Sequence, residues 1–396
     1  MVDIDTALGV WEAAQCLASN TPNPMADGGI VQMRHRQSGH SHPDVPPAAH
    51  RFHRIAHRPV DLCFMMVVFQ NKIIYMPFFP PTSRSETIEN WESMCGGVKW
   101  VKEKTMSADG KELALAVTTV PLPKGGRQQS SPPLDGQPPK AHVYVLYFQG
   151  NAGSIPPRLP DISWVLRAVS DSKTHDLAPT ASELTFVCLS YRGYWTSRGR
   201  PSERGLRLDA EAGVRWIAER HERAFGSGDG GATPAVKSIL LVWGQSVGSG
   251  VATNLAATGR VPPNMPVRGL LLETPFVSIK AMLQTLYPQK WLPYRYLGPF
   301  LRNHLDSWGN LGLIDRAAKE KGTSPPMVYI LEAERDELVP KDQSESLYKR
   351  CQDLGIPVEK GVVPVAFHQQ AIARGDGKKL AAQAILKLTQ RALEDA

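Results

Sequence analysis

Cysteine is scarce in this 396-residue chain, and several other common features are missing. The five cysteines lie far apart and form no CxxC pair: Cys16, Cys63, Cys95, Cys188 and Cys351. A disulfide framework and a zinc site are therefore not expected. The chain also has no glycosylation sequon, and its first residues lack the basic start and apolar core of a signal peptide. These absences favour a reducing, cytoplasmic location.

Long apolar runs and dense basic blocks are missing as well. The longest apolar run, Leu62–Phe69, is far shorter than the roughly 20 residues that span a bilayer as a helix. The net charge is +7, but the basic residues are spread along the chain without interleaved aromatics. Nucleic acid is therefore not an expected partner. The hydrophobic share of 42% and charged share of 21% are typical of a globular protein.

The first 58 residues differ from the rest. They contain six of the eleven histidines and several prolines, with no sustained hydrophobic period. We expect residues 1–58 to form a disordered His/Pro-rich tail, followed by one domain over residues 59–396. The histidines of "HRQSGHSH" are irregularly spaced, so no metal site is expected there.

The domain opens with an apolar and aromatic segment, "DLCFMMVVFQNKIIYMPFFPP". Two interpretations of residues 60–81 stay open. The segment either packs onto the domain or lies on a membrane as an interfacial anchor, which would give a peripheral membrane contact. Packing is favoured, because Asn71 and Lys72 interrupt the apolar run.

A β-hairpin is expected next. Val98–Lys104 and Glu112–Val120 have strand-like patterns and are joined through an Asp109-Gly110 turn. The polar, Pro/Gly-rich residues 121–140 that follow are expected to form a mobile loop.

From residue 141 onward, strand and helix patterns alternate. Apolar strands are expected at Ala141–Phe148, Glu183–Ser190, Ser238–Trp243, Val267–Glu273, Met327–Leu331 and Pro357–Val363. Helices are expected at Leu159–Val169, Ser202–Arg220, Val247–Thr258, Asp342–Gln352 and Lys378–Leu393. This order predicts an α/β fold: a mostly parallel sheet covered by helices on both faces, with the antiparallel hairpin at one edge. Residues 275–322 break the alternation with many aromatics and prolines, and we expect a helical cap insertion there.

Ser246 is the candidate nucleophile. In "LVWGQSVGSG" it follows a strand and precedes a helix, and Gly244 and Gly248 flank it. So tight a turn leaves no room for side chains at the flanking positions. This is the pattern of the nucleophile elbow of an α/β hydrolase, which holds the hydroxyl at the carboxyl edge of the sheet.

A serine nucleophile needs a base and an orienting acid, in the chain order Ser, acid, His for this fold. His368 is the only histidine after His304, and it follows the last strand. For the acid, Asp336 is favoured, a short loop beyond the preceding strand. The competing carboxylates are Glu332, Glu334, Glu337 and, after an earlier strand, Glu273. The oxyanion donors are expected to be the backbone N–H groups of Val247 and, in the loop "FQGNAGS", of Asn151.

The chain resembles the bud-emergence-type α/β hydrolases, serine hydrolases whose relatives include protein depalmitoylases. The resemblance covers roughly residues 65–395 and rests on "QNKIIYMP", "QGNAGS", "SYRGYWTSRGRPSERGLRLDAEAGVRWI", "GQSVGSG", "ETPF", "ERDELVP" and His368. It implies a Ser246, Asp336 and His368 triad and places the Tyr191–Tyr194 loop beside the active site. Gln149 stands where relatives usually have His, and Trp195 where a glycine is common.

These features together predict a serine esterase, thioesterase or lipase that needs no metal or organic cofactor. The expected substrate is an ester of a small molecule or an acylated protein, since the aromatic cap is suited to an apolar acyl group. Candidate substrate-binding residues are Gln149, Tyr191, Tyr194, Phe276 and Trp291. Two alternatives stay open: an aminopeptidase-like hydrolase and a non-catalytic scaffold with a hydrolase fold.

Overall fold

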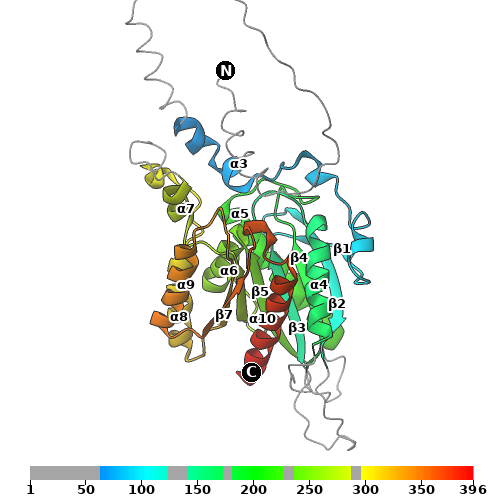
Figure 1. Cartoon of the computed structure of the whole chain (residues 1–396). Coiled ribbons are helices and arrows are strands. Elements are labelled where there is room, and N and C mark those ends of the chain that lie inside the picture. The colour runs from blue at the N-terminus through cyan, green and yellow to red at the C-terminus, as the bar shows by residue number, and fades with distance from the viewer. Residues whose placement is uncertain (1–62, 124–140, 173–180, 227–235, 287–295, 396) are drawn as a thin grey trace, which may run out of the picture. The chain divides into compact units, whose positions relative to one another are not determined.

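The computed structural model describes residues 63–123, 141–172, 181–226, 236–286 and 296–395. An eight-stranded sheet runs through them in the order β1-β2-β4-β3-β5-β6-β7-β8 (Figure 1). Its strands are β1 (Val101–Met106), β2 (Glu112–Pro121), β3 (Ala141–Phe148), β4 (Ala181–Leu189), β5 (Lys237–Gln245), β6 (Val267–Glu273), β7 (Met327–Ala333) and β8 (Val358–Val363). The β1–β2 and β2–β4 pairs are antiparallel and the other neighbours are parallel. The predicted fold class is therefore confirmed.

The leading hairpin turns where the sequence predicts it. Gly110 has a φ of +74°, and the Ser107 N–H donates to the Lys111 carbonyl at 2.9 Å. Its first strand, however, starts at Val101 rather than at Val98. Trp100, just before it, is buried and donates its indole N–H to Ser163 Oγ at 2.8 Å. Packing of this side chain against a helix takes the segment out of the sheet.

Helices cover both faces of the sheet, as expected. The buried side chains of α4 (Leu159–Ser170) and α10 (Gly375–Glu394) share one hydrophobic cluster with the sheet. A second cluster, on the other face, includes side chains of α5 (Glu203–Phe225), α6 (Val247–Thr258), α8 (Ser307–Lys321) and α9 (Lys341–Leu354). In α5, the apolar residues Leu206, Ala210, Val214 and Ile217 are all buried, as their helical spacing predicts.

The segment predicted as a cap divides into two parts. Its described residues contain no strand; they form α7 (Ile279–Leu286), the short 3₁₀ helix η5 (Gly298–Phe300) and α8. Leu311 and Ile314 of α8 are buried in the second cluster, and Asn310 Nδ2 donates to Thr253 Oγ1 of α6 at 3.4 Å. Helix α8 therefore belongs to the layer that covers the sheet, rather than to a separate cap.

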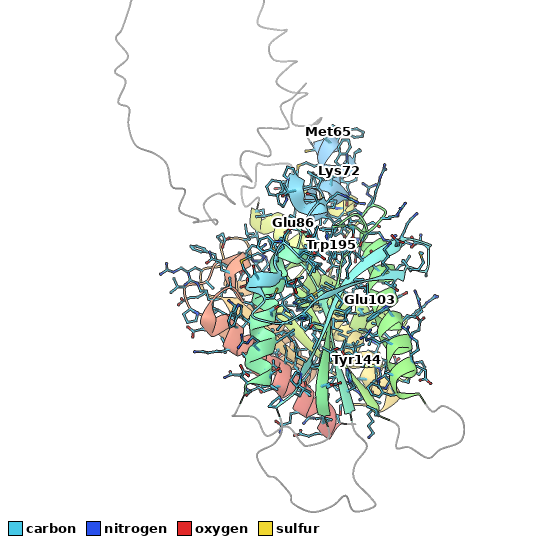
Figure 2. All side chains as sticks on the ribbon, turned by 90° about the vertical axis from the view of Figure 1, so that its right-hand side faces the viewer. Met65, Lys72, Glu86, Glu103, Tyr144 and Trp195 are labelled. Atoms are coloured by element: carbon cyan, nitrogen blue, oxygen red, sulfur yellow. The ribbon has the colours of Figure 1, made fainter. Side chains whose placement is uncertain are left out.

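The entry segment packs on one side and is open on the other. Residues 63–68 are helical, and α3 (Gln70–Tyr75) follows. Gln70 Nε2 donates to the Phe300 carbonyl at 3.1 Å, and the Tyr75 hydroxyl donates to Asn303 at 3.0 Å. The other side carries an exposed apolar stripe made of Phe64, Met65, Val68, Phe69, Ile73 and Phe78. Figure 2 shows Met65 and Lys72 of this segment at the top of the view, above Trp195.

Three predictions on these regions are not tested by the structure. The tail (1–58) and residues 124–140 of the expected mobile loop lie outside the described residues, as does Trp291. Within the described ranges, no helix is both long and apolar enough to cross a membrane.

Candidate active site

Ser246 lies on a strained turn between β5 and α6. Its backbone has φ 50° and ψ −116°, and its side chain is nearly buried. A Cβ atom added to Gly244 would lie 2.2 Å from the Gly248 carbonyl oxygen, and one added to Gly248 would lie 2.1 Å from that of Phe148. Both flanking positions therefore require glycine, as the sequence predicts.

Asp336 and His368 are brought together at the same edge of the sheet. Asp336 Oδ2 lies 2.7 Å from His368 Nδ1; the imidazole is buried and Asp336 is partly buried. The other carboxylate oxygen accepts the N–H groups of Leu338 at 3.0 Å and Val339 at 2.7 Å. The backbone thus holds the carboxylate through one oxygen, and the other oxygen can orient the imidazole.

The competing carboxylates have other partners. Glu332 accepts from Ser344 Oγ, Glu334 from the Val365 N–H, and Glu337 from the backbone N–H of His368. Glu273 is fully buried and pairs with Arg158. Among the carboxylates proposed from the sequence, Asp336 is the one that faces the imidazole.

Ser246 and His368 are linked through the residues next to them. Gln245 Nε2 donates to Gln369 Oε1 at 3.0 Å, which joins the residue before the serine to the residue after the histidine. In the described part of the chain, the Ser246 hydroxyl makes no hydrogen bond to the imidazole itself. Catalytic hydrogen bonds of this kind are often long without substrate and shorten when it binds.

The expected oxyanion donors belong to two segments that adjoin the serine. Val247 is the first residue of α6, so its N–H has no acceptor within the helix and lies at the positive end of the helix dipole. A Cβ atom at Gly150 would be 3.5 Å from Ser246 Cβ, so the loop that carries Asn151 contacts the nucleophile turn. The next two N–H groups of this loop, of Ala152 and Gly153, donate to the carbonyls of Tyr75 and Phe79.

Three of the proposed substrate-binding residues are buried and bond to the loop that carries Asn151 or to its neighbours. The Tyr191 hydroxyl donates to the Gln149 carbonyl at 3.0 Å, and the Tyr194 hydroxyl donates to the Tyr75 carbonyl. Burial raises the pKa of both phenols, so they remain neutral donors. Gln149 donates to the Ala152 carbonyl at 3.1 Å, while its Oε1 is buried without a partner. These hydrogen bonds hold the loop in place, and contact of the three residues with substrate stays a prediction. Phe276 is likewise buried, in the core.

Backbone strain collects at this edge of the sheet. Five non-glycine residues in the loops after β3, β4, β5, β6 and β8 have positive φ: Ala152, Trp195, Ser246, Thr274 and Val365. Each such residue costs on the order of 1–3 kcal/mol, and clusters of them are typical of functional sites. Trp195 is held by a 2.7 Å bond from its indole N–H to the Glu86 carbonyl.

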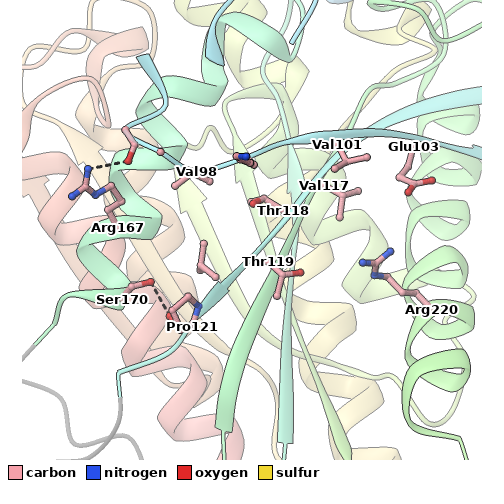
Figure 3. A pocket seen from close by; sticks show the side chains of 14 residues that line it. Val98, Val101, Glu103, Val117, Thr118, Thr119, Pro121, Arg167, Ser170 and Arg220 are labelled. Atoms are coloured by element: carbon pink, nitrogen blue, oxygen red, sulfur yellow. Dashed lines mark hydrogen bonds between the residues drawn. The ribbon is translucent and has the colours of Figure 1, made fainter. Parts of the chain in front are cut away.

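A groove of about 610 Å³ elsewhere on the molecule is not part of this site. It opens between the β1–β2 edge and helices α4 and α5, where Arg167 and Arg220 flank it (Figure 3). No residue of the predicted triad lines it. A second pocket of about 110 Å³ is lined by Asp336, together with Thr274 and Glu332. Within the described ranges, no three His, Cys, Asp or Glu side chains are grouped to hold a metal ion.

Comparison with known proteins gives partial matches. No family model matches the chain. It is 29% identical to the protein bem46 of Schizosaccharomyces pombe over 55% of this chain and 59% of that protein. It is 33% identical to the lysophosphatidylserine lipase ABHD12 of Mus musculus over 52% of this chain and 45% of that protein. The chain thus spans about half the length of the curated relatives it matches.

A solved structure shares the fold. It is an alpha-beta hydrolase from Vibrio vulnificus, with a TM-score of 0.50 at 16% identity. The match covers 78% of this chain and 92% of the Vibrio chain.

Proposed function

Because this chain is a bud-emergence-type member of the α/β-hydrolase superfamily, we propose that it is a serine hydrolase of carboxylic esters or thioesters. The observation that carries the proposal is the 2.7 Å contact between Asp336 and His368 at the sheet edge that holds Ser246. The strained turn at Ser246, with α6 starting directly after it, supports the same role.

The proposed reaction has two halves. Ser246 Oγ attacks the acyl carbonyl, and His368 Nε2 takes the hydroxyl proton and passes it to the leaving alcohol or thiol. Water then attacks the acyl-serine, and the imidazole again takes a proton and returns it to Ser246 Oγ. Asp336 orients the imidazole and stabilises its charged form. The N–H groups of Val247 and Asn151 bind the oxyanion of each tetrahedral intermediate.

A lipid-like substrate at a membrane surface fits the outer part of the site. The apolar stripe belongs to the segment whose Tyr75 and Phe79 carbonyls accept from the oxyanion loop, so it borders the proposed site. Exposed cationic side chains, Lys72 and Arg302, lie in and beside it. We therefore propose peripheral contact with a lipid surface through this stripe, as well as an acyl-chain substrate. The lipase named among the relatives supports the same substrate class.

The proposal is tested with a fluorophosphonate probe and a series of esters of increasing chain length, run beside a peptide amide. The wild type should be labelled and should prefer esters. Ser246→Ala should lose labelling and at least about 10³-fold in kcat. Ser238→Ala, which changes a serine at the start of β5, is the matched control and should behave as wild type.

Two results would overturn the proposal. A wild type that is neither labelled nor active would be a scaffold. Faster cleavage of the amide than of every ester would indicate an aminopeptidase-like hydrolase.

A further inference from the structure

A buried ion pair lies beneath the proposed site and has no part in the triad. Glu273, the last residue of β6, is fully buried, and a terminal nitrogen of Arg158 donates to its Oε1. Arg158 ends the short 3₁₀ helix η3 (Pro156–Arg158), and its side chain is 14% exposed. Replacing a buried pair with apolar residues is often neutral or stabilising. The pair therefore has no evident purpose in stability alone.

Both members of the pair bond to segments that carry the reacting groups. The second terminal nitrogen of Arg158 donates to the carbonyl of Gln369, directly after His368, at 3.1 Å. The backbone carbonyl of Glu273 accepts the N–H of Ser246 at 2.8 Å. One guanidinium therefore connects the end of β6, beside the nucleophile, with the loop of the base.

A second route connects the same segments through side chains. Arg158 Nε donates to the Tyr147 hydroxyl at 3.4 Å, and that hydroxyl donates to Gln245 Oε1 at 3.1 Å. Gln245 in turn donates to Gln369. Arg158, Tyr147, Gln245 and Gln369 thus form a closed ring, in which the side chain of Gln369 accepts from Gln245 and its main-chain carbonyl accepts from Arg158. Trp243 completes the surroundings by donating its indole N–H to Glu273 Oε2 at 3.0 Å.

Arg158 keeps its charge in this ring, and Tyr147 stays neutral. Burial by itself lowers the pKa of Arg158, but the charge of Glu273, with Tyr147 and Asp161, raises it overall. Burial also raises the pKa of Tyr147, so the phenol remains a donor. Arginine suits this position because its planar fork donates in three directions, whereas lysine offers a single point charge.

We propose that Arg158 and Glu273 are positioning residues, which set the separation of Ser246 from His368 by fixing the loop after β8. This inference rests on the proposed hydrolysis for its kinetic consequence. Neither side chain touches the reacting atoms, so the expected effect is on kcat rather than on KM. A misplacement of about 1 Å in a catalytic group can cost about 10²-fold in rate.

The main test uses the double variant Arg158→Met, Glu273→Leu in the full chain. Removing both charges together avoids an unpaired buried charge, so this variant should fold. Its kcat on a soluble ester should fall about 10²-fold, with KM within about twofold of wild type. Arg158→Lys keeps a positive charge beside Glu273 but cannot also donate to Gln369. Its kcat should lie between those of the wild type and the double variant. Val214→Ala, a cavity variant in α5, controls for stability loss and should keep wild-type kcat.

A second readout does not depend on activity. Amide hydrogen exchange of residues 366–371 should be faster in the double variant, while exchange in α5 and α6 stays unchanged. A double variant with wild-type kcat, or with unchanged exchange in this loop, would overturn the inference. If the wild type hydrolysed no ester at all, the proposed function would fail, and the exchange experiment would still decide whether the pair fixes the loop.

Discussion

The glycines around Ser246 have different amounts of space, although all lie near the nucleophile. An added methyl group at Gly248 would meet backbone atoms of Phe148 and Gln149 at 2.1 and 2.8 Å, and these atoms belong to β3 and the loop after it. At Gly150 the nearest atom would be Ser246 Cβ at 3.5 Å, an ordinary contact. Gly248→Ala should therefore destabilise the fold by more than about 2 kcal/mol. Urea denaturation with tryptophan fluorescence measures this.

Gly150→Ala is the matched control, because it adds the same methyl group beside the same serine. It should stay within about 1 kcal/mol of wild type, since its backbone has no positive φ. Equal stability of the two variants would mean that the β5–α6 turn is not packed on β3 as described.

Single residues were predictable from the sequence where the fold demands one residue type at one place. Asp336 and His368 follow the last two strands in the required order, and the structure pairs them. Arg158 could not be found this way. It stands in "PPRLP", and only folding brings its guanidinium under Gln369, more than 200 positions away. The hydrogen bonds of Tyr191 and Tyr194 could not be predicted either, because their motif does not reveal that both hydroxyls bond to backbone carbonyls.

Two histidines are buried between β3 and the end of α5. Burial, with the charges of His221 and Arg220, lowers the pKa of His142 to about 4, and burial lowers that of His221 as well. Between about pH 6.5 and pH 4, His142 is protonated in the unfolded chain but neutral in the folded chain. The free energy of unfolding should therefore fall as the pH decreases from about 6.5 to about 4. The contribution of His142 is roughly 2–3 kcal/mol.

The comparison of wild type with His142→Gln isolates this contribution. The amide retains a hydrogen-bonding group for Thr185 Oγ1, which lies 2.8 Å from the imidazole, but does not titrate. Denaturation curves at pH 7.5 and pH 4.5 should show a smaller loss of stability in the variant. Equal losses in the two proteins would contradict a neutral, buried imidazole.

Helices and strands were predictable where the spacing of apolar residues follows a single period without interruption. Helix α5 extends only five residues beyond its predicted end, with Ser202 as its cap. Helix α8 was assigned to a cap because prolines and aromatics precede it, yet Asp306 starts a regular helix by accepting the Gly309 N–H at 3.0 Å. The local sequence pattern does not show which surface a helix covers. For α8, this depends on its packing against α6.

At the scale of the whole molecule, the apolar stripe and the proposed site share one end of the sheet. Phe64 and Val68 are four residues apart, and so are Met65, Phe69 and Ile73. This spacing places the exposed apolar side chains along one side of the helical segment. Phe300, also exposed, lies beside Gln70, which bonds to its carbonyl. An exposed apolar surface of this kind is typical of an interaction site.

The double variant Phe64→Ser, Phe69→Ser should bind vesicles of phosphatidylcholine and phosphatidylserine at least about tenfold more weakly than the wild type, because it loses two apolar anchors. Sedimentation of the full chain with vesicles measures this. Trp164→Ser on α4 removes an aromatic side chain that is 45% exposed and should bind as the wild type does. Hydrolysis of a soluble ester should be unchanged in the double variant, whereas hydrolysis of a vesicle-borne ester should fall with binding. Equal vesicle binding by the wild type and the double variant would show that the stripe contacts no lipid. The proposed site would then take its substrate from solution, since its proposed orientation toward a bilayer rests on these side chains.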